Sequence, residues 1–190
     1  TEIYTLSLHD ALPISLVGRG QERDMSILHR NIAMAENVAR LAQTVGAGKV
    51  IHASTMAVYP NRTGVYSEES PTYAAGNTEC LYGLSKICAE QVLDFLLPAG
   101  CRVAHLRFAQ VYGPGMRPDR TPARMEEELR RTNAVTVFGN GERESNFIGI
   151  DAVVEAVVRF VRNDACGVYN IGGEQLTYRA LAEGILARCG

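Results

Sequence analysis

Tyr82 and Lys86 are the two side chains of this sequence whose types and spacing best suit chemistry. They lie four residues apart in the segment Tyr-Gly-Leu-Ser-Lys, so on a helix they share one face. An ammonium beside a phenol stabilises the phenolate and lowers a pKa that is ordinarily about 10. Such a tyrosine can take a proton from a hydroxyl group or return it. A solvated surface pair is the alternative, although Lys49 and Lys86 are the only lysines of the chain.

The composition predicts a globular protein and excludes several classes of function. The 190 residues are 46% hydrophobic and 21% charged, as in ordinary globular domains. A net charge of −2 gives no basic footprint for nucleic acid. No apolar run approaches the roughly 20 residues of a membrane span. The five cysteines are dispersed without metal-ligand spacing, which predicts no metal site and a cytoplasmic protein with reduced thiols.

The first fourteen residues look foreign to the protein. Residues 1–14 read, codon by codon, like the translation of a common sequencing adapter, so we expect a non-native scar there. A gene cut at its 5′ end would account for such a scar. We therefore expect this chain to be an N-terminally truncated fragment that is itself inactive.

Helices and strands are predicted to alternate along the rest of the chain. Apolar periodicity and breakers predict helices over 24–43, 80–97, 121–132 and 151–162, and a last one capped by Thr177. Asp151 is expected to cap the fourth of these. Short β-branched runs predict strands at 50–53, 102–108, 135–138 and 168–171. Turns are expected at 46–48 and 139–141, and a long functional loop over 56–79.

This alternation predicts an α/β fold with a parallel sheet. In such sheets functional groups gather where strands end. Thr55 follows the first strand and Ala109-Gln110 follow the second, so both loops are expected to converge with Tyr82 on one crevice. His52, inside the first strand, is expected to be a hydrogen-bonded core histidine rather than a catalyst.

Six segments in collinear order resemble the extended short-chain dehydrogenase/reductases, the NAD-dependent epimerase/dehydratase family. The segments are Asn31-Ile-Ala-Met-Ala-Glu-Asn-Val, Ser54-Thr-Met-Ala-Val-Tyr, Tyr82-x-x-x-Lys86, Arg107-Phe-Ala-Gln-Val-Tyr-Gly-Pro, Gly139-Asn-Gly followed by Asn146-Phe-Ile-Gly-Ile-Asp, and Gly167-Val-Tyr-Asn-Ile-Gly. Each match alone is weak. Together they identify the chain, from about residue 24 onward, as a member of this family.

The resemblance implies a fold and a division into domains. It implies a partial Rossmann-type parallel sheet with helices on both faces, plus part of a small α/β substrate-binding region. The dinucleotide-binding part would comprise residues 15–112 and 147–171. The substrate-binding part would comprise residues 113–146 and 172–190.

The resemblance also implies roles for single residues. Tyr82 would be the catalytic acid/base, Lys86 would tune it and bind the nicotinamide ribose, and Thr55 would bind the same substrate oxygen as Tyr82. Asn31 and the backbone at Ala109 would contact the cofactor. That cofactor would be NAD, with NADP left open, because the residues that choose between them are expected upstream, with the absent glycine-rich phosphate loop. The full-length protein would be a homodimer through the helices at 24–43 and 80–97.

Departures from the family pattern bear on the substrate. Met56-Ala57 replace the Asp-Glu of nucleotide-sugar 4,6-dehydratases, which disfavours elimination of water. Ser145 replaces an arginine that pairs with the substrate diphosphate, and Arg143 is a candidate substitute. Gln110 replaces the usual asparagine and is a candidate substrate-binding residue.

Three functions follow from these observations. The first is an epimerase-type oxidoreductase acting on a nucleotide-sugar, which exchanges hydride at a carbinol carbon. The second is an NAD(P)H-dependent reductase of a small carbonyl compound. The third is a non-catalytic dinucleotide-binding regulator, which would not need Thr55, Tyr82 and Lys86 together.

Overall fold

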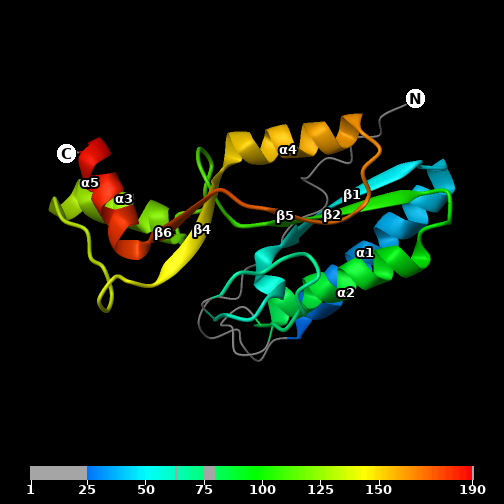
Figure 1. Cartoon of the computed structure of the whole chain (residues 1–190), viewed down its shortest axis with the longest axis horizontal. Helices are drawn as coiled ribbons and strands as arrows, with labels where there is room; N and C mark the ends of the chain where they lie inside the picture. The colour runs from blue at the N-terminus through cyan, green and yellow to red at the C-terminus, as the bar shows by residue number, and fades with distance from the viewer. Residues whose placement is uncertain (1–24, 63, 75–79, 190) are drawn as a thin grey trace. The chain divides into compact units, whose positions relative to one another are not determined.

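The computed structural model describes residues 25–62, 64–74 and 80–189, in which helices and strands alternate (Figure 1). The helices are α1 (Ser26–Val45), α2 (Cys80–Leu96), α3 (Thr121–Thr132), α4 (Ile150–Arg162) and α5 (Tyr178–Cys189), with a 3-10 turn η1 (Met56–Val58). The strands are β1 (Lys49–Thr55), β2 (Arg102–Phe108), β3 (Gln110–Tyr112), β4 (Glu144–Gly149), β5 (Gly167–Ile171) and β6 (Glu174–Thr177). A parallel sheet has the order β1-β2-β5, which confirms the predicted α/β class.

The chain divides into two compact units. One comprises residues up to 106 together with 165–168, and the other comprises 107–164 and 169 onward. The predicted domain boundaries, which differ from these, stay a prediction. Residues 1–14, predicted to be a scar, lie outside the described residues. None of the described helices is both long and apolar enough to cross a bilayer.

In the first unit, α1 and α2 pack side by side (Figure 1). Their buried contact consists of Ala35 and Ala39 from α1 and Ala89 and Leu93 from α2. Three of these four side chains are single methyl groups, so the helix backbones can approach closely. Gly46 ends α1 in the left-handed conformation with φ 65°, as the breaker at 46–48 predicts. The helix that carries Tyr82 and Lys86 is therefore held along its length.

In the second unit, three short strands form a separate sheet. β3 pairs in parallel with β4, with Gln110 opposite Phe147, and β4 pairs antiparallel with β6, with Glu144 opposite Thr177. Helices α3 and α5 pack together through Met125, Leu129, Ala182 and Ile185. None of these three strands is predicted from the sequence, because each is short and its partner lies far along the chain.

Two predictions of local structure are wrong. Residues 135–138 do not form a strand: the backbone N–H of Thr136 donates to the carboxylate of Glu128, which takes the place of a strand partner. Val135 and Val137 pack instead against the α3–α5 core. Asp151 does not cap α4, because the helix begins at Ile150 and Asp151 lies in its first turn. The Thr177 hydroxyl does cap α5, accepting from the N–H of Ala180 at 3.0 Å.

Candidate active site

Lys86 and Tyr82 lie close together on α2, as their spacing predicts. The Lys86 ammonium lies 6.0 Å from the centroid of the Tyr82 ring and donates a hydrogen bond to Ala53 O at 2.8 Å. Lys86 is only 7% exposed, and this burial lowers its pKa from 10.5 to about 8, while the nearby Glu90 carboxylate opposes the shift. The site therefore holds a buried cation beside a half-buried phenol.

Thr55 ends β1, two residues after Ala53, whose carbonyl accepts the Lys86 hydrogen bond. Its backbone is extended, and its Oγ1 accepts a hydrogen bond from the N–H of Ala57 at 3.2 Å, which starts the turn η1. A threonine hydroxyl that accepts a bond still has its own O–H to donate. The turn thus fixes Thr55 Oγ1 while leaving a donor for a substrate oxygen.

Gly83 lets α2 approach the turn that follows Thr55. A Cβ atom at Gly83 would lie 2.3 Å from Ala57 O and 2.9 Å from the Cβ of Ala74. Since α2 also contacts β1 and η1 directly, glycine at this position sets how near Tyr82 comes to Thr55.

Replacing Gly83 by alanine is expected to destabilise the chain by about 1–3 kcal/mol, because the added Cβ would overlap the Ala57 carbonyl. The higher helix propensity of alanine, about 1 kcal/mol, opposes only part of this loss. Urea unfolding measures the change. Gly184→Ala in α5 is the matched control, since a Cβ there meets nothing within 4 Å and should be neutral or stabilising. Equal effects of the two substitutions would contradict the packing argument.

The side chain of Asn31, a residue of α1, lies between α1 and α2. It is 5% exposed, and its Nδ2 donates to Ser85 Oγ at 2.6 Å, while the Ser85 hydroxyl donates to Tyr82 O at 2.7 Å. This chain of bonds ties α1 to the backbone of the tyrosine. The structure gives Asn31 a place in the scaffold of the site, and its predicted contact with the cofactor stays a prediction.

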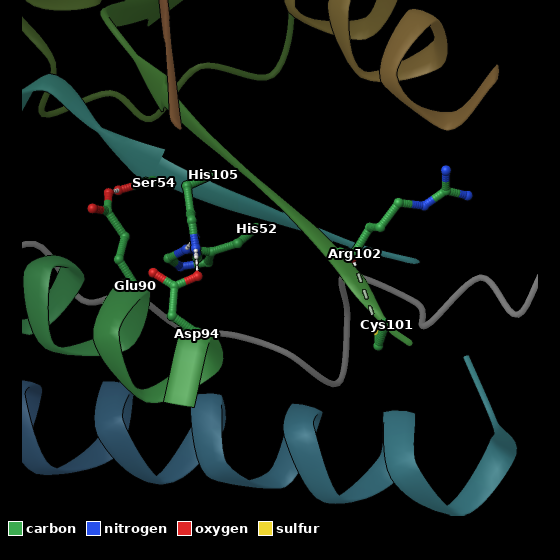
Figure 2. Close-up of polar contacts among 7 residues, drawn as sticks. All are labelled: His52, Ser54, Glu90, Asp94, Cys101, Arg102 and His105. Carbon is green, nitrogen blue, oxygen red and sulfur yellow. Dashed lines mark hydrogen bonds and ion pairs between the residues drawn. The ribbon is translucent and has the colours of Figure 1, made fainter. Parts of the chain in front are cut away.

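A stripe of charged residues on α2 faces β1 and β2. The polar stripe, defined as Lys86, Glu90 and Asp94, repeats every four residues along one face of the helix. Figure 2 shows Glu90 and Asp94 pointing from α2 toward side chains of these strands. Glu90 accepts a bond from Ser54 Oγ at 2.5 Å, and Asp94 contacts His105 Nε2 at 3.1 Å.

His52 of β1 contacts His105, the partner of Asp94. Its Nδ1 lies 3.0 Å from Nδ1 of His105, so one of the two rings donates to the other (Figure 2). Burial, followed by the charges of Lys86 and His105, lowers the pKa of His52 from 6.5 to about 2. The expectation of a hydrogen-bonded histidine is confirmed, although the side chain is half-buried and not part of the core. The ring is neutral at physiological pH.

The other predicted site residues belong to the second unit. The backbone N–H of Ala109 donates to Ile171 O at 3.1 Å. Gln110 Nε2 donates to Ser145 Oγ at 2.6 Å and lies 3.5 Å from Tyr178 Oη. The Arg143 guanidinium lies 5.7 Å from the centroid of the Tyr178 ring, as in a cation–π contact. Convergence of these residues with Tyr82 stays a prediction.

Several residues of the site were missed in the sequence. They are Ser54, Gly83, Ser85, Glu90 and Tyr178. Glu90 could have been found from its helical spacing to Lys86, because a carboxylate one turn from a buried ammonium is a natural partner. Ser54 lies beside Thr55 on the opposite face of the strand, so the alternation of β1 points it toward α2. Tyr178 carries no local signal, since β4 and β6 were not predicted.

The parallel sheet and its crossing helix define a Rossmann-type α/β protein, and solved structures share this fold. The UDP-glucose 4-epimerase of Thermotoga maritima with UDP-glucose matches with a TM-score of 0.80 at 25% identity, covering 92% of this chain and 58% of that one. MoeE5 in complex with UDP-glucose and NAD matches with a TM-score of 0.78 at 26% identity, covering 90% and 58%.

The chain belongs to the NAD dependent epimerase/dehydratase family, whose profile matches residues 5–172. Among curated relatives, GDP-mannose 3,5-epimerase 1 of Oryza sativa subsp. indica is 28% identical, over 88% of this chain and 47% of the relative. UDP-glucuronate 4-epimerase of Thermodesulfobacterium geofontis is 24% identical, over 75% and 44%. The chain spans about half the length of the curated relatives it matches. The predicted family is thus confirmed.

Proposed function

We propose that this chain carries the proton-transfer residues of an NAD(P)-dependent sugar-nucleotide epimerase. The observation that carries the proposal is the placement of Thr55, Tyr82 and Lys86: the Lys86 ammonium is buried beside the Tyr82 ring and bonded to the strand that ends in Thr55. The chain's family and its relatives, several of which are named as sugar-nucleotide epimerases, support the same function.

Each of the three side chains has a separate proposed role at the substrate hydroxyl. Tyr82 takes the hydroxyl proton as the carbinol carbon is oxidised, and returns it after hydride has come back to the opposite face of the resulting ketone. The Lys86 cation stabilises the phenolate form of Tyr82. Thr55 donates its O–H to the same oxygen and steadies the charge that develops there.

The donor set of the site fits a bound NAD. The Lys86 ammonium has three N–H donors and gives one to Ala53 O, which leaves donors for a ribose hydroxyl of the cofactor. NAD, when bound, supplies the hydride acceptor for oxidation at carbon. Lys86, Tyr82, Asn31 and the Ala109 backbone are the residues proposed to contact it. Lys86 and Tyr82 would hold its nicotinamide end, whether the cofactor is NAD or NADP.

The second unit is proposed to bind the sugar-nucleotide. The hydrogen bond between Gln110 and Ser145 joins two of the positions at which this chain departs from its family pattern. Arg143, stacked on Tyr178 and exposed, is proposed to supply the cation for the substrate diphosphate that Ser145 cannot supply. The predicted substrate-binding residues are thus Thr55, Gln110 and Arg143.

Product analysis on the full-length protein tests this function against its alternatives. The protein is incubated with NAD and, in turn, with UDP- and GDP-sugars, and the sugars are separated while the absorbance of NADH is followed. An epimerase yields the epimer without net NADH. Stoichiometric consumption of NADH with a small carbonyl compound favours the reductase, and NAD binding without turnover of any substrate favours the regulator.

We further propose a cytoplasmic homodimer. Free thiols at Cys80, Cys88, Cys101 and Cys166 support the compartment. The family resemblance supports pairing through α1 and α2. Phe95 of α2 is 86% exposed, and a groove between the two helices is lined by Ala39, Arg40 and Leu96. Light scattering of the full-length protein distinguishes this dimer from a monomer.

A further inference from the structure

Glu90 is a buried carboxylate to which the proposed reaction gives no direct role. It is 3% exposed, one helical turn beyond Lys86 on α2. Ser54 Oγ donates to its Oε1 at 2.5 Å (Figure 2). Burying a carboxylate costs several kcal/mol unless charge or hydrogen bonds compensate it. The Ser54 hydroxyl and the Lys86 ammonium offset part of this cost, and the carboxylate in turn acts on Lys86.

We propose that Glu90 is a positioning residue of the site: fixed by the Ser54 hydroxyl, its carboxylate keeps the buried Lys86 ammonium charged and in place beside Tyr82. The inference rests on the proposed function, because the charge of Lys86 matters only if Tyr82 transfers a proton. In this proposal Glu90 acts on the reaction through Lys86 and is not itself a proton donor or acceptor for the substrate.

The geometry of β1 supports this role. Ser54 and Thr55 are consecutive, so their side chains lie on opposite faces of the strand. The preceding residue, Ala53, accepts the Lys86 hydrogen bond. Ala53 therefore binds the lysine and Ser54 binds the carboxylate, so α2 and β1 are joined at two points. The next residue of β1, Thr55, carries the hydroxyl proposed to bind the substrate.

The charges around Lys86 support it as well. Burial drives the lysine toward its neutral form, and the carboxylate of Glu90 is what opposes this. From β1 and β2, His52 and His105 face the same region, and His52 is neutral. Arg107, which is 5% exposed, is two residues beyond His105 on β2 and so lies on the same face of that strand. The turn η1 has no ionisable residue, and the buried residues of α1 (Ile27, Asn31, Ala35, Ala39 and Ala42) have none either. Asp94 is one turn beyond Glu90 and half-exposed, bonded to His105.

Lysine titration by NMR tests the proposal on the chain itself. With isotope-labelled lysine the chain gives two side-chain signals, and Lys49→Arg assigns them. We expect the Lys86 midpoint near pH 8 in the parent chain and about one unit lower in Glu90→Gln, which keeps the shape and can still accept from Ser54. Asp94→Asn is the matched control and should leave the midpoint unchanged.

Glu90→Asp separates charge from shape. Aspartate keeps the charge but shortens the side chain, so its midpoint should lie between those of the parent chain and Glu90→Gln. A merely structural role would instead make Glu90→Asp at least as disruptive as the isosteric glutamine. If Glu90→Gln does not fold, Glu90→Met, which also removes the charge at similar size, decides: a midpoint equal to that of the parent chain overturns the proposal.

Turnover of the full-length protein provides the second readout. In Glu90→Gln the alkaline limb of the rate profile should move to lower pH by the same shift as the Lys86 midpoint, with little change at lower pH. An unchanged midpoint and limb would overturn the role of Glu90 while leaving the proposed function intact. Failure of the proposed function would appear separately, as turnover that survives loss of the Tyr82 hydroxyl.

Discussion

Replacing Tyr82 by phenylalanine is expected to reduce turnover of the full-length protein by roughly 10²–10⁴-fold, the usual contribution of a positioned acid/base. The substitution removes only the hydroxyl group. The ring that lies 6.0 Å from the Lys86 ammonium stays, and so do the hydrogen bonds through Ser85 and Asn31, which reach the backbone of residue 82. Folding and NAD affinity should therefore change little, and the loss should fall on kcat. Steady-state kinetics with the substrate found by product analysis measures it.

Tyr73→Phe is the matched control for this experiment. Tyr73 lies in the loop before α2 and is 55% exposed, so losing its hydroxyl should leave the rate unchanged. Turnover of Tyr82→Phe within about twofold of the parent protein would be too small a loss for general acid/base catalysis. That result would remove Tyr82 from the proton path and favour the non-catalytic alternative.

The chain is expected to lose stability steeply in mild acid because of His52. The pKa of His52 is lowered from 6.5 to about 2 in the folded chain, so the folded ring stays neutral where the unfolded ring takes up a proton. Below pH 6.5 the unfolded state therefore binds more protons, and the free energy of unfolding falls as pH falls, by up to about 1.4 kcal/mol for each pH unit. Between pH 6.5 and about pH 4.5 the loss attributable to His52 is roughly 2 kcal/mol.

Urea unfolding at several pH values measures this slope. His52→Gln should flatten it, because glutamine does not titrate, whatever the substitution does to stability at neutral pH. His29→Gln on the exposed surface of α1 is the matched control and should keep the parent slope. If His52→Gln and the parent chain lose stability in parallel as the pH falls, the burial of a neutral His52 is contradicted.

Long elements of the fold could be predicted because their signals are local. The helices α1, α2, α3 and α4 begin and end within a few residues of the predicted bounds, where apolar periodicity and breakers such as Gly46 mark them. The strands of the parallel sheet carry β-branched or apolar runs. By contrast, β3, β4 and β6 have three to six residues each and form only because distant segments pair, which no short window records.

The candidate site shows the same division between local and distant information. Tyr82, Lys86 and Thr55 could be predicted as site residues because their spacing or strand position implies chemistry. The side chains that hold them could not. Ser85 and Ser54 are ordinary hydroxyl residues until their partners Asn31 and Glu90, 54 and 36 residues away, are known. The wrong strand at 135–138 has a similar origin, since the Glu128 carboxylate satisfies a backbone donor that β-propensity assigns to a sheet.

Because the residues of the polar stripe are four positions apart, α2 should tolerate substitutions in this segment better than insertions or deletions. Lys86, Glu90 and Asp94 each meet a fixed partner on β1 or β2, at Ala53, Ser54 and His105. Inserting or deleting one residue between them would rotate everything beyond that point by about 100° around the helix axis, since an α-helix has about 3.6 residues per turn. Several bonds would be lost together, whereas a substitution costs one. In genetic terms, codon changes within this segment are graded in effect, and single-codon insertions and deletions are all-or-none.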